Sequence, residues 1–139
     1  MEPTDTLPTT ERGEGYTRVN LLSVADSAAP NGFGETGEAR FATGDLDAER
    51  TGVALHSLRP GRRQSFGHRH EQAEEVYVVI AGSGRVKVDD AIVELAPRDA
   101  IRVAPTAARC FEAGDDGMEL LAFGPRHQGD GEILPGWWG

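Results

Sequence analysis

Residues 61–82, GRRQSFGHRHEQAEEVYVVIAG, are the stretch that decides the fold of this chain. The stretch holds His68 and His70, separated by one residue, and Glu75 five residues after His70. Because side chains alternate between the two faces of a β-strand, the two histidines point to the same side. Two imidazoles and a carboxylate are a ligand set that suits Zn, Mn, Fe or Ni. The stretch therefore predicts a β scaffold that brings three candidate metal ligands together.

Short strands surround this stretch at close spacing, which is typical of an antiparallel sandwich or barrel rather than of βαβ units. The expected strands are residues 16–22, 38–42, 53–58, 64–70, 75–80, 85–88, 92–95, 100–103, 109–112 and 118–123. Residues 82–84, Gly-Ser-Gly, predict a hairpin turn, and residues 114–117 predict a loop. No stretch predicts a long helix. The pattern indicates an all-β fold built as an antiparallel barrel.

The length of 139 residues suits one domain. We expect a loose polar arm at residues 1–15, the barrel at residues 16–125 and a tail at residues 126–139. The tail ends in Trp137 and Trp138, and adjacent tryptophans are seldom left in water. We therefore expect one of them to dock on the barrel or on a neighbouring chain.

Composition excludes several classes of partner. The net charge of -9 argues against a surface for nucleic acid or for an anionic membrane, because both require a basic patch. The longest apolar run, residues 76–81, is too short to cross a bilayer. The polar N-terminus is not a signal peptide. Cys110 is the single cysteine, so no internal disulfide forms, and a cytoplasmic location is expected.

The residues of the opening stretch resemble the cupin family of small antiparallel jelly-roll barrels. The first motif of that family is a Gly, a His-x-His pair, a Glu shortly after it and a later Gly. Gly61, His68, His70, Glu75 and Gly82 match this motif, and the resemblance covers roughly half of the chain. It implies a jelly-roll barrel in which the two histidines and the glutamate are metal ligands.

The second motif of the family is degenerate here. Arg98 and Thr106 stand where the family has glycines, and Ala113 stands where it has Asn. Arg109 stands where the family has the histidine that completes the metal site. An arginine keeps its proton in a protein and cannot ligate a cation, and its charge repels a divalent ion. The resemblance therefore implies a modified metal site.

Three interpretations of this site stay open. In the first, Arg109 pairs with Glu75 and fills the space of a metal, leaving a small-molecule-binding pocket without one. In the second, His68, His70 and Glu75 hold a metal and Arg109 binds a carboxylate or phosphate of a substrate. The resemblance then implies a dioxygenase or isomerase that acts on a small organic acid. In the third, the barrel is structural or regulatory and takes no ligand. The cost of burying an unpaired Glu75 favours the first interpretation.

Other candidate ligand-binding residues share faces with the site. Gln64 and Phe66 have the parity of His68, Tyr77 has the parity of the glutamate, and His56 lies on a neighbouring strand. Each residue also has a structural interpretation. Gln64 could bond the backbone through its amide, Phe66 could form an apolar wall, Tyr77 could pack its ring in the core, and His56 could have its hydrogen bonds met within the sheet. We expect the chain to bind a small molecule, which can be anionic, and to form a homodimer. We expect it to bind neither nucleic acid nor a membrane.

Overall fold

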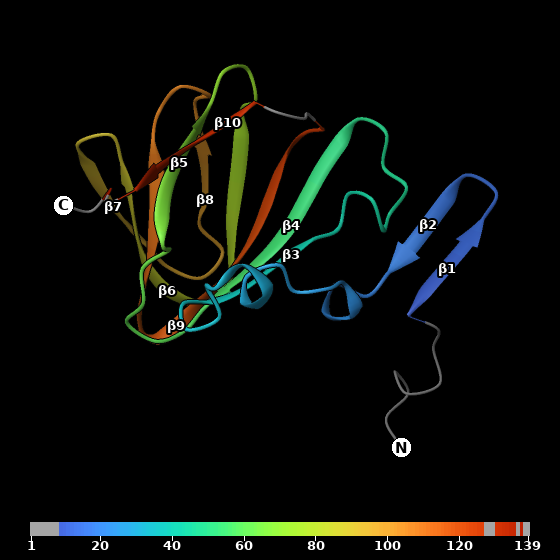
Figure 1. Cartoon of the computed structure of the whole chain (residues 1–139), viewed down its shortest axis with the longest axis horizontal. Coiled ribbons are helices and arrows are strands. Elements are labelled where there is room, and N and C mark those ends of the chain that lie inside the picture. Colours follow the sequence, from blue (N-terminus) through green and yellow to red (C-terminus); the bar gives the residue numbers. More distant parts are fainter. Residues whose placement is uncertain (1–8, 127–129, 136, 138–139) are drawn as a thin grey trace.

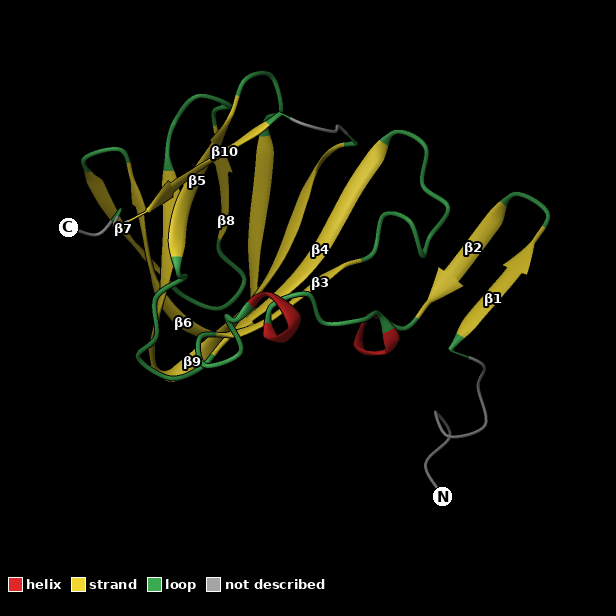
Figure 2. Ribbon diagram, viewed as in Figure 1, coloured by secondary structure: helices red, strands yellow, loops and turns green. Residues whose placement is uncertain are grey.

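The structure, a computed structural model, describes residues 9–126, 130–135 and 137 (Figure 1). Eight strands form one curled antiparallel sheet, and two more form a separate hairpin. Within the described residues, helix occurs as two short turns, at Leu21–Ser23 and Ala29–Asn31 (Figure 2). The predicted all-β antiparallel barrel is confirmed.

The barrel curls around two long strands, β6 (Glu75–Val88) and β9 (Arg109–Pro125). They pair antiparallel, with two register shifts that fall between Val79 and Gly84. Because both strands bend there, each contributes to both halves of the curl. Because the pairing is antiparallel, the start of β6 lies beside the end of β9, and the end of β6 lies beside the start of β9.

Three further strands complete each half. The half at the end of β9 contains β3 (Gly37–Phe41), β4 (Thr51–Leu58) and β8 (Ala100–Val103). The half at the start of β9 contains β5 (Phe66–His70), β7 (Ala91–Leu95) and β10 (Gly131–Pro135). The strand that carries the two histidines thus lies between β9 and β10.

The prediction of a hairpin turn at residues 82–84 is wrong, because β6 continues through it. Gly82 has a φ of 71°, and a Cβ there would lie 2.1 Å from the carbonyl oxygen of Gly117. The two backbones approach so closely at the bend that only glycine fits. Residues 114–117 likewise belong to β9 instead of forming a loop. A glycine in a strand marks a bulge as well as a turn, and the sequence signal is the same for both.

The core fills the space between the two halves. Its residues are Ala54, Leu58, Tyr77, Val79, Val86, Leu95, Val103, Phe111, Ala113, Met118, Leu120 and Ala122. Alternate residues of β6 and β9 point inward, as the pleat requires. Among the described residues, the buried polar or charged ones are His70 and Arg109. Both belong to the candidate site.

An N-terminal hairpin precedes the barrel and is joined to it by an ion pair. β1 (Thr10–Gly13) and β2 (Tyr16–Val19) form a hairpin beside the barrel (Figure 1). The Nε of Arg12 on this hairpin pairs with Oδ2 of Asp47 at 2.7 Å. The arm expected at residues 1–15 therefore contains a strand, while residues 1–8 lie outside the described part.

In the described part of the C-terminal tail, β10 pairs with β5, and Trp137 lies on the barrel. The indole Nε1 of Trp137 donates to the carbonyl of Lys87 at 3.4 Å, and the Lys87 ammonium lies 5.0 Å from the ring centre. The ring also covers Gly67, where a Cβ would lie 2.6 Å from it. Trp138 is outside the described residues. No described helix has the length and apolar character needed to cross a membrane.

Candidate metal and ligand site

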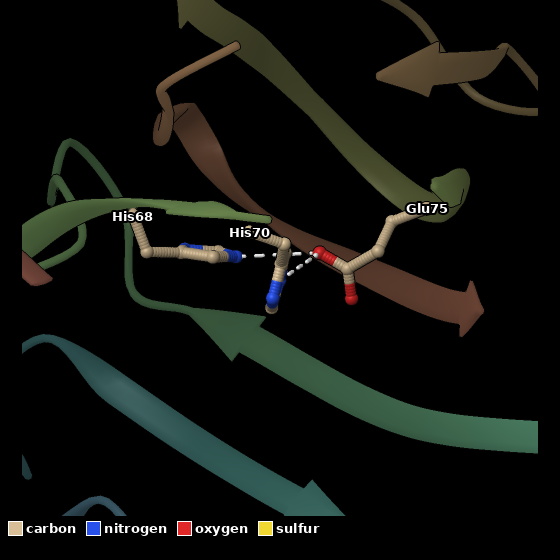
Figure 3. A group of neighbouring side chains, drawn as sticks. All are labelled: His68, His70 and Glu75. Atoms are coloured by element: carbon tan, nitrogen blue, oxygen red, sulfur yellow. Dashed lines mark hydrogen bonds and ion pairs between the residues drawn. The ribbon is translucent and has the colours of Figure 1, made fainter. Parts of the chain in front are cut away.

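Strand β5 and the start of β6 bring the three candidate ligands together (Figure 3). His68 and His70 project from one face of β5, and Glu75 is the first residue of β6. Nε2 of His68 lies 3.3 Å from Oε1 of Glu75, and Nε2 of His70 lies 3.0 Å from the same oxygen. One ligand atom of each residue falls within 4.8 Å of the others. The structure therefore brings together the group that the sequence predicts.

Tyr77 adds a fourth group to this cluster. It lies two residues after Glu75 on the same face of β6, and its hydroxyl donates to Oε1 of Glu75 at 2.6 Å. The hydroxyl also lies 3.4 Å from Nε2 of His68. The Tyr77 ring packs on Phe111 with the centroids 4.7 Å apart, and the residue is 3% exposed. Tyr77 therefore does both things expected of it: its ring packs in the core, and its hydroxyl lies in the site.

The electrostatics of the cluster favour a charged Glu75. Burial alone would raise the pKa of Glu75, but hydrogen bonds from His68 and Tyr77 outweigh it and lower the pKa to about 2. Burial lowers the pKa of His70, although the nearby carboxylate opposes this effect. Burial and the same carboxylate raise the pKa of Tyr77 well above its ordinary value. At neutral pH the cluster therefore contains one partly buried negative charge that needs a partner.

Arg109 provides a positive charge beside that carboxylate. It is the first residue of β9, directly opposite His68 in the ladder, and its side chain is 0% exposed. Its Nη1 donates to the carbonyl of Pro105 at 3.4 Å, and its Nη2 donates to the carbonyl of Ala104 at 3.3 Å. Nη2 lies 3.9 Å from Oε1 of Glu75. The loop before β9 thus holds the guanidinium in ion-pair range of Glu75, without a bidentate contact.

Exposure differs sharply among the four charged or ligating groups. The side chain of His68 is 25% exposed and that of Glu75 is 17% exposed. The side chain of His70 is 9% exposed, and Arg109 is inaccessible. A molecule from solvent therefore meets His68 first, whereas Arg109 forms the inner wall.

The residues fit a metal in part. His68, His70 and Glu75 have the donor atoms and the convergence that a divalent ion with three protein ligands needs. The fourth position holds Arg109, which has no lone pair to give. Its fixed positive charge also repels a divalent ion held by the other three residues. Arg109 therefore weakens whatever metal affinity the other three residues provide.

The remaining candidates from the sequence occupy different places. His56 on β4 faces inward beside the site, where burial, followed by the charge of His68, lowers its pKa to about 4. Phe66 lies on the histidine face of β5 and meets Phe33 edge-on at 5.4 Å between centroids. Oε1 of Gln64 accepts from the backbone N–H of Phe111 at 3.1 Å. Gln64 precedes β5, and that bond gives its amide a structural use.

Asp130 is a neighbour of the site that the sequence pattern did not single out. Its Oδ2 lies 3.7 Å from Nδ1 of His70, and both side chains are about one-tenth exposed. A pocket of about 200 Å³ lies against these two residues, lined also by Arg69, Glu71, Thr106, Gly131 and Glu132. No local signal marks Asp130, because only the pairing of β10 with β5 brings it to the site.

Comparisons with known proteins identify the fold. The family model for the Cupin domain matches residues 54–124. A cupin protein from Bacteroides fragilis is 22% identical over 83% of this chain and 87% of that one, with a TM-score of 0.65. Oxalate decarboxylase from Bacillus subtilis at pH 4.6 is 19% identical over 82% of this chain and 31% of that one, with a TM-score of 0.69. No curated protein matches the sequence. At these identities the structural likeness establishes the fold, and the chain spans about a third of the decarboxylase.

Proposed function

Because this chain belongs to the cupin family, we propose that it binds a small molecule at the barrel mouth, in a site where Arg109 replaces the fourth metal ligand. The carrying observation is the buried cluster in which Glu75 accepts from Tyr77 at 2.6 Å and lies 3.9 Å from the guanidinium of Arg109. This arginine balances the charge of the carboxylate without a metal. A barrel with a purely structural role would bury apolar side chains here at lower cost.

The ligand meets the site from the side of His68. This imidazole is the most exposed of the four charged or ligating groups, and Phe66 with Phe33 forms an aromatic wall on the same face of β5. A small molecule with a polar end toward His68 and Glu75 and an apolar body toward Phe66 suits this arrangement. Small organic acids are the first class to test, because Arg109 leaves a positive charge in the inner wall.

A metal-dependent enzyme is the second candidate, favoured by the convergence of three ligand atoms within 4.8 Å. His68, His70 and Glu75 would hold the ion, which would supply Lewis-acid chemistry or, as Fe or Mn, redox chemistry. Tyr77 would keep Glu75 oriented through its hydroxyl, and Arg109 would face the anionic end of a substrate. A dioxygenase or an isomerase of a small organic acid is the corresponding activity.

Metal content separates the two candidates. Protein purified without a histidine tag is analysed for Zn, Mn, Fe and Ni as wild type, Glu75→Ala and Arg109→His. We expect substoichiometric metal in the wild type and about one equivalent in Arg109→His, because the histidine supplies a donor and removes a repelling charge. Arg102→His is the matched control, since Arg102 lies on the surface and its side chain is 61% exposed. One equivalent in the wild type that is lost in Glu75→Ala would overturn the first candidate in favour of the second.

Ligand binding separates both candidates from a structural barrel. Small mono- and dicarboxylic acids are titrated into wild type and His68→Ala by calorimetry and by NMR. We expect chemical-shift changes at His68 and Phe66 in the wild type that are lost in the variant. Binding that is unchanged in His68→Ala would place the ligand elsewhere and contradict the proposed site.

We also propose a cytoplasmic homodimer. Within the described residues β7, β8 and β10 each pair with one other strand, and open strand edges favour pairing with another chain. Phe123 on β9 faces away from the core and is 37% exposed, which leaves apolar area for a second chain. The buried Cys110 is the single cysteine of the chain and has no disulfide partner within it, which is compatible with a reducing compartment. Light scattering should give twice the chain mass of 14.9 kDa, and a mass of one chain would contradict the dimer.

A further inference from the structure

The C-terminal segment, residues 130–135 and 137, covers one edge of β5, the strand that carries both histidines. β10 pairs with β5 along its whole length, from Gly131 opposite His70 to Pro135 opposite Phe66. Beyond β10, Trp137 is fixed on Lys87 by two hydrogen bonds. A part of the chain far from residues 61–82 in sequence is therefore built into the wall of the site.

Asp130, the residue before β10, binds the turn between two site residues. Its Oδ1 accepts from the backbone N–H of Glu71 at 2.8 Å, and its Oδ2 accepts from the N–H of Ala73 at 2.9 Å. The N–H of Gln72 lies 3.2 Å and 3.3 Å from the two oxygens. Three consecutive N–H groups thus converge on one carboxylate. These residues are the connection from His70 to Glu75, so Asp130 sets how the two approach each other.

The same carboxylate faces the ring of His70 from behind. Oδ2 lies 3.7 Å from Nδ1, while Nε2 on the other side of the ring faces Glu75 at 3.0 Å. The Asp130 side chain is 10% exposed, so solvent screens this interaction little. When Nε2 of an imidazole binds a metal, the N–H on the other side of the ring can donate a hydrogen bond to a carboxylate behind it, which orients the ring. At 3.7 Å, Asp130 lies in ion-pair range of that nitrogen.

We propose that Asp130 is a positioning residue of the site, which fixes both the turn from His70 to Glu75 and the orientation of the His70 imidazole. This inference rests on the proposed function in one respect, because it takes His70 and Glu75 to be residues of the site. It applies with or without a metal, because Asp130 bonds the turn and places its charge 3.7 Å from Nδ1 of His70 in either case. It makes the C-terminal segment part of the functional unit.

The test uses the full chain and compares Asp130→Asn with Glu132→Gln. Glu132 is the matched control, since it lies on β10 and pairs with Arg69 at the surface, where its side chain is 56% exposed. Asn keeps the size of Asp but replaces one acceptor oxygen with a donor. We expect amide exchange of residues 71–73 to become about tenfold faster in Asp130→Asn, because at least one N–H loses its acceptor. We also expect the ring ¹⁵N shifts of His70 to change while those of His56 stay fixed.

The ring resonances distinguish positioning from a purely structural role. Faster amide exchange with unchanged His70 resonances would overturn the proposal, and so would changes of the same size in Glu132→Gln. If Asp130→Asn does not fold, Asp130→Glu is measured in the same way and should restore part of the amide protection. Co²⁺ titration gives a second measurement, for which we expect about 10–100-fold weaker binding in Asp130→Asn. Absence of Co²⁺ binding in the wild type would count against the metal-dependent candidate alone, and the ring shifts would then decide the role of Asp130.

Discussion

Arg109 and Glu112 lie three residues apart on β9 and belong to two contrasting ion-pair clusters. Inside the barrel, Nη2 of Arg109 lies 3.9 Å from the carboxylate of Glu75, and the guanidinium is 0% exposed. Outside, Glu112 is held between Nε of Arg63 at 2.5 Å and Nε of Arg85 at 2.6 Å. The outer contacts are much shorter. Distance alone would rank the outer cluster as the stronger one.

Burial reverses that ranking. The side chains of Arg63 and Arg85 are 47% and 35% exposed, so water and salt screen the outer pairs. The carboxylates are similarly exposed, Glu75 at 17% and Glu112 at 18%, but the guanidinium of Arg109 is 0% exposed, and the loss of one partner of this pair leaves a charge without compensation. The inner cluster is therefore coupled to stability and to the choice between arginine and metal, whereas the outer cluster serves mainly to pair surface charges.

The largest effect is expected for Arg109→Met, which removes the inner positive charge and keeps most of the side-chain volume. Glu75 then lacks its cationic neighbour, and the free energy of unfolding should fall by about 3–5 kcal/mol. Urea unfolding in the presence of a metal chelator measures this change. A loss below about 1 kcal/mol would show that the guanidinium does not compensate the carboxylate.

The double variant Arg109→Met/Glu75→Gln provides the control. If the cost comes from an uncompensated charge, the neutral amide should restore a large part of the lost stability. If the cost comes from lost packing or from the bonds of Arg109 to the carbonyls of Ala104 and Pro105, the two changes should instead add. The double-mutant cycle therefore separates charge balance from structural support.

The next effect concerns the hydroxyl of Tyr77, the shortest contact of the inner cluster at 2.6 Å. Tyr77→Phe removes a donor to a charged acceptor and should lower the free energy of unfolding by about 1.5–3 kcal/mol. Tyr16→Phe is the matched control, because Tyr16 is 56% exposed and should change stability by less than about 0.5 kcal/mol. Equal losses in the two variants would contradict a special role for the inner hydroxyl.

The sequence could predict the inner cluster in part, and the reason is local geometry. Alternation puts His68 and His70 on one face of β5, and the short connection to β6 keeps Glu75 near them. That Glu75 faces the histidines depends on the curl of the sheet, because β5 and β6 do not pair with each other. Arg109 could be placed in the site only by the family resemblance. Its bonds to Ala104 and Pro105 depend on the loop before β9, which no periodicity describes. Asp130 was missed because it reaches the turn only through the pairing of β10 with β5.

The strands of the fold could likewise be predicted from local sequence, whereas their lengths and pairing depend on residues far apart in the chain. Alternation identified the strands, but it did not show that residues 75–88 are one strand and residues 109–125 another. Gly82 and Gly117 carry turn signals, and in the structure their positive φ angles of 71° and 77° serve the paired bend of β6 and β9. Whether a glycine ends a strand or bends it depends on the strand beside it.

The smallest effect is expected for Glu112→Gln in the outer cluster. Burial alone would raise the pKa of Glu112, but hydrogen bonds from Arg63 and Arg85 outweigh it and lower the pKa below the ordinary carboxyl value. Its pairing therefore stabilises the folded protein at pH values above the ordinary pKa, and this contribution is lost as the pH falls through the lowered pKa. We expect a cost below about 1 kcal/mol at neutral pH, which shrinks in about 1 M salt and disappears in acid. Unfolding of wild type and variant at stepped pH and salt measures it. A loss that persisted in high salt would show that the outer pairs are shielded from solvent, and the contrast with Arg109 would then fail.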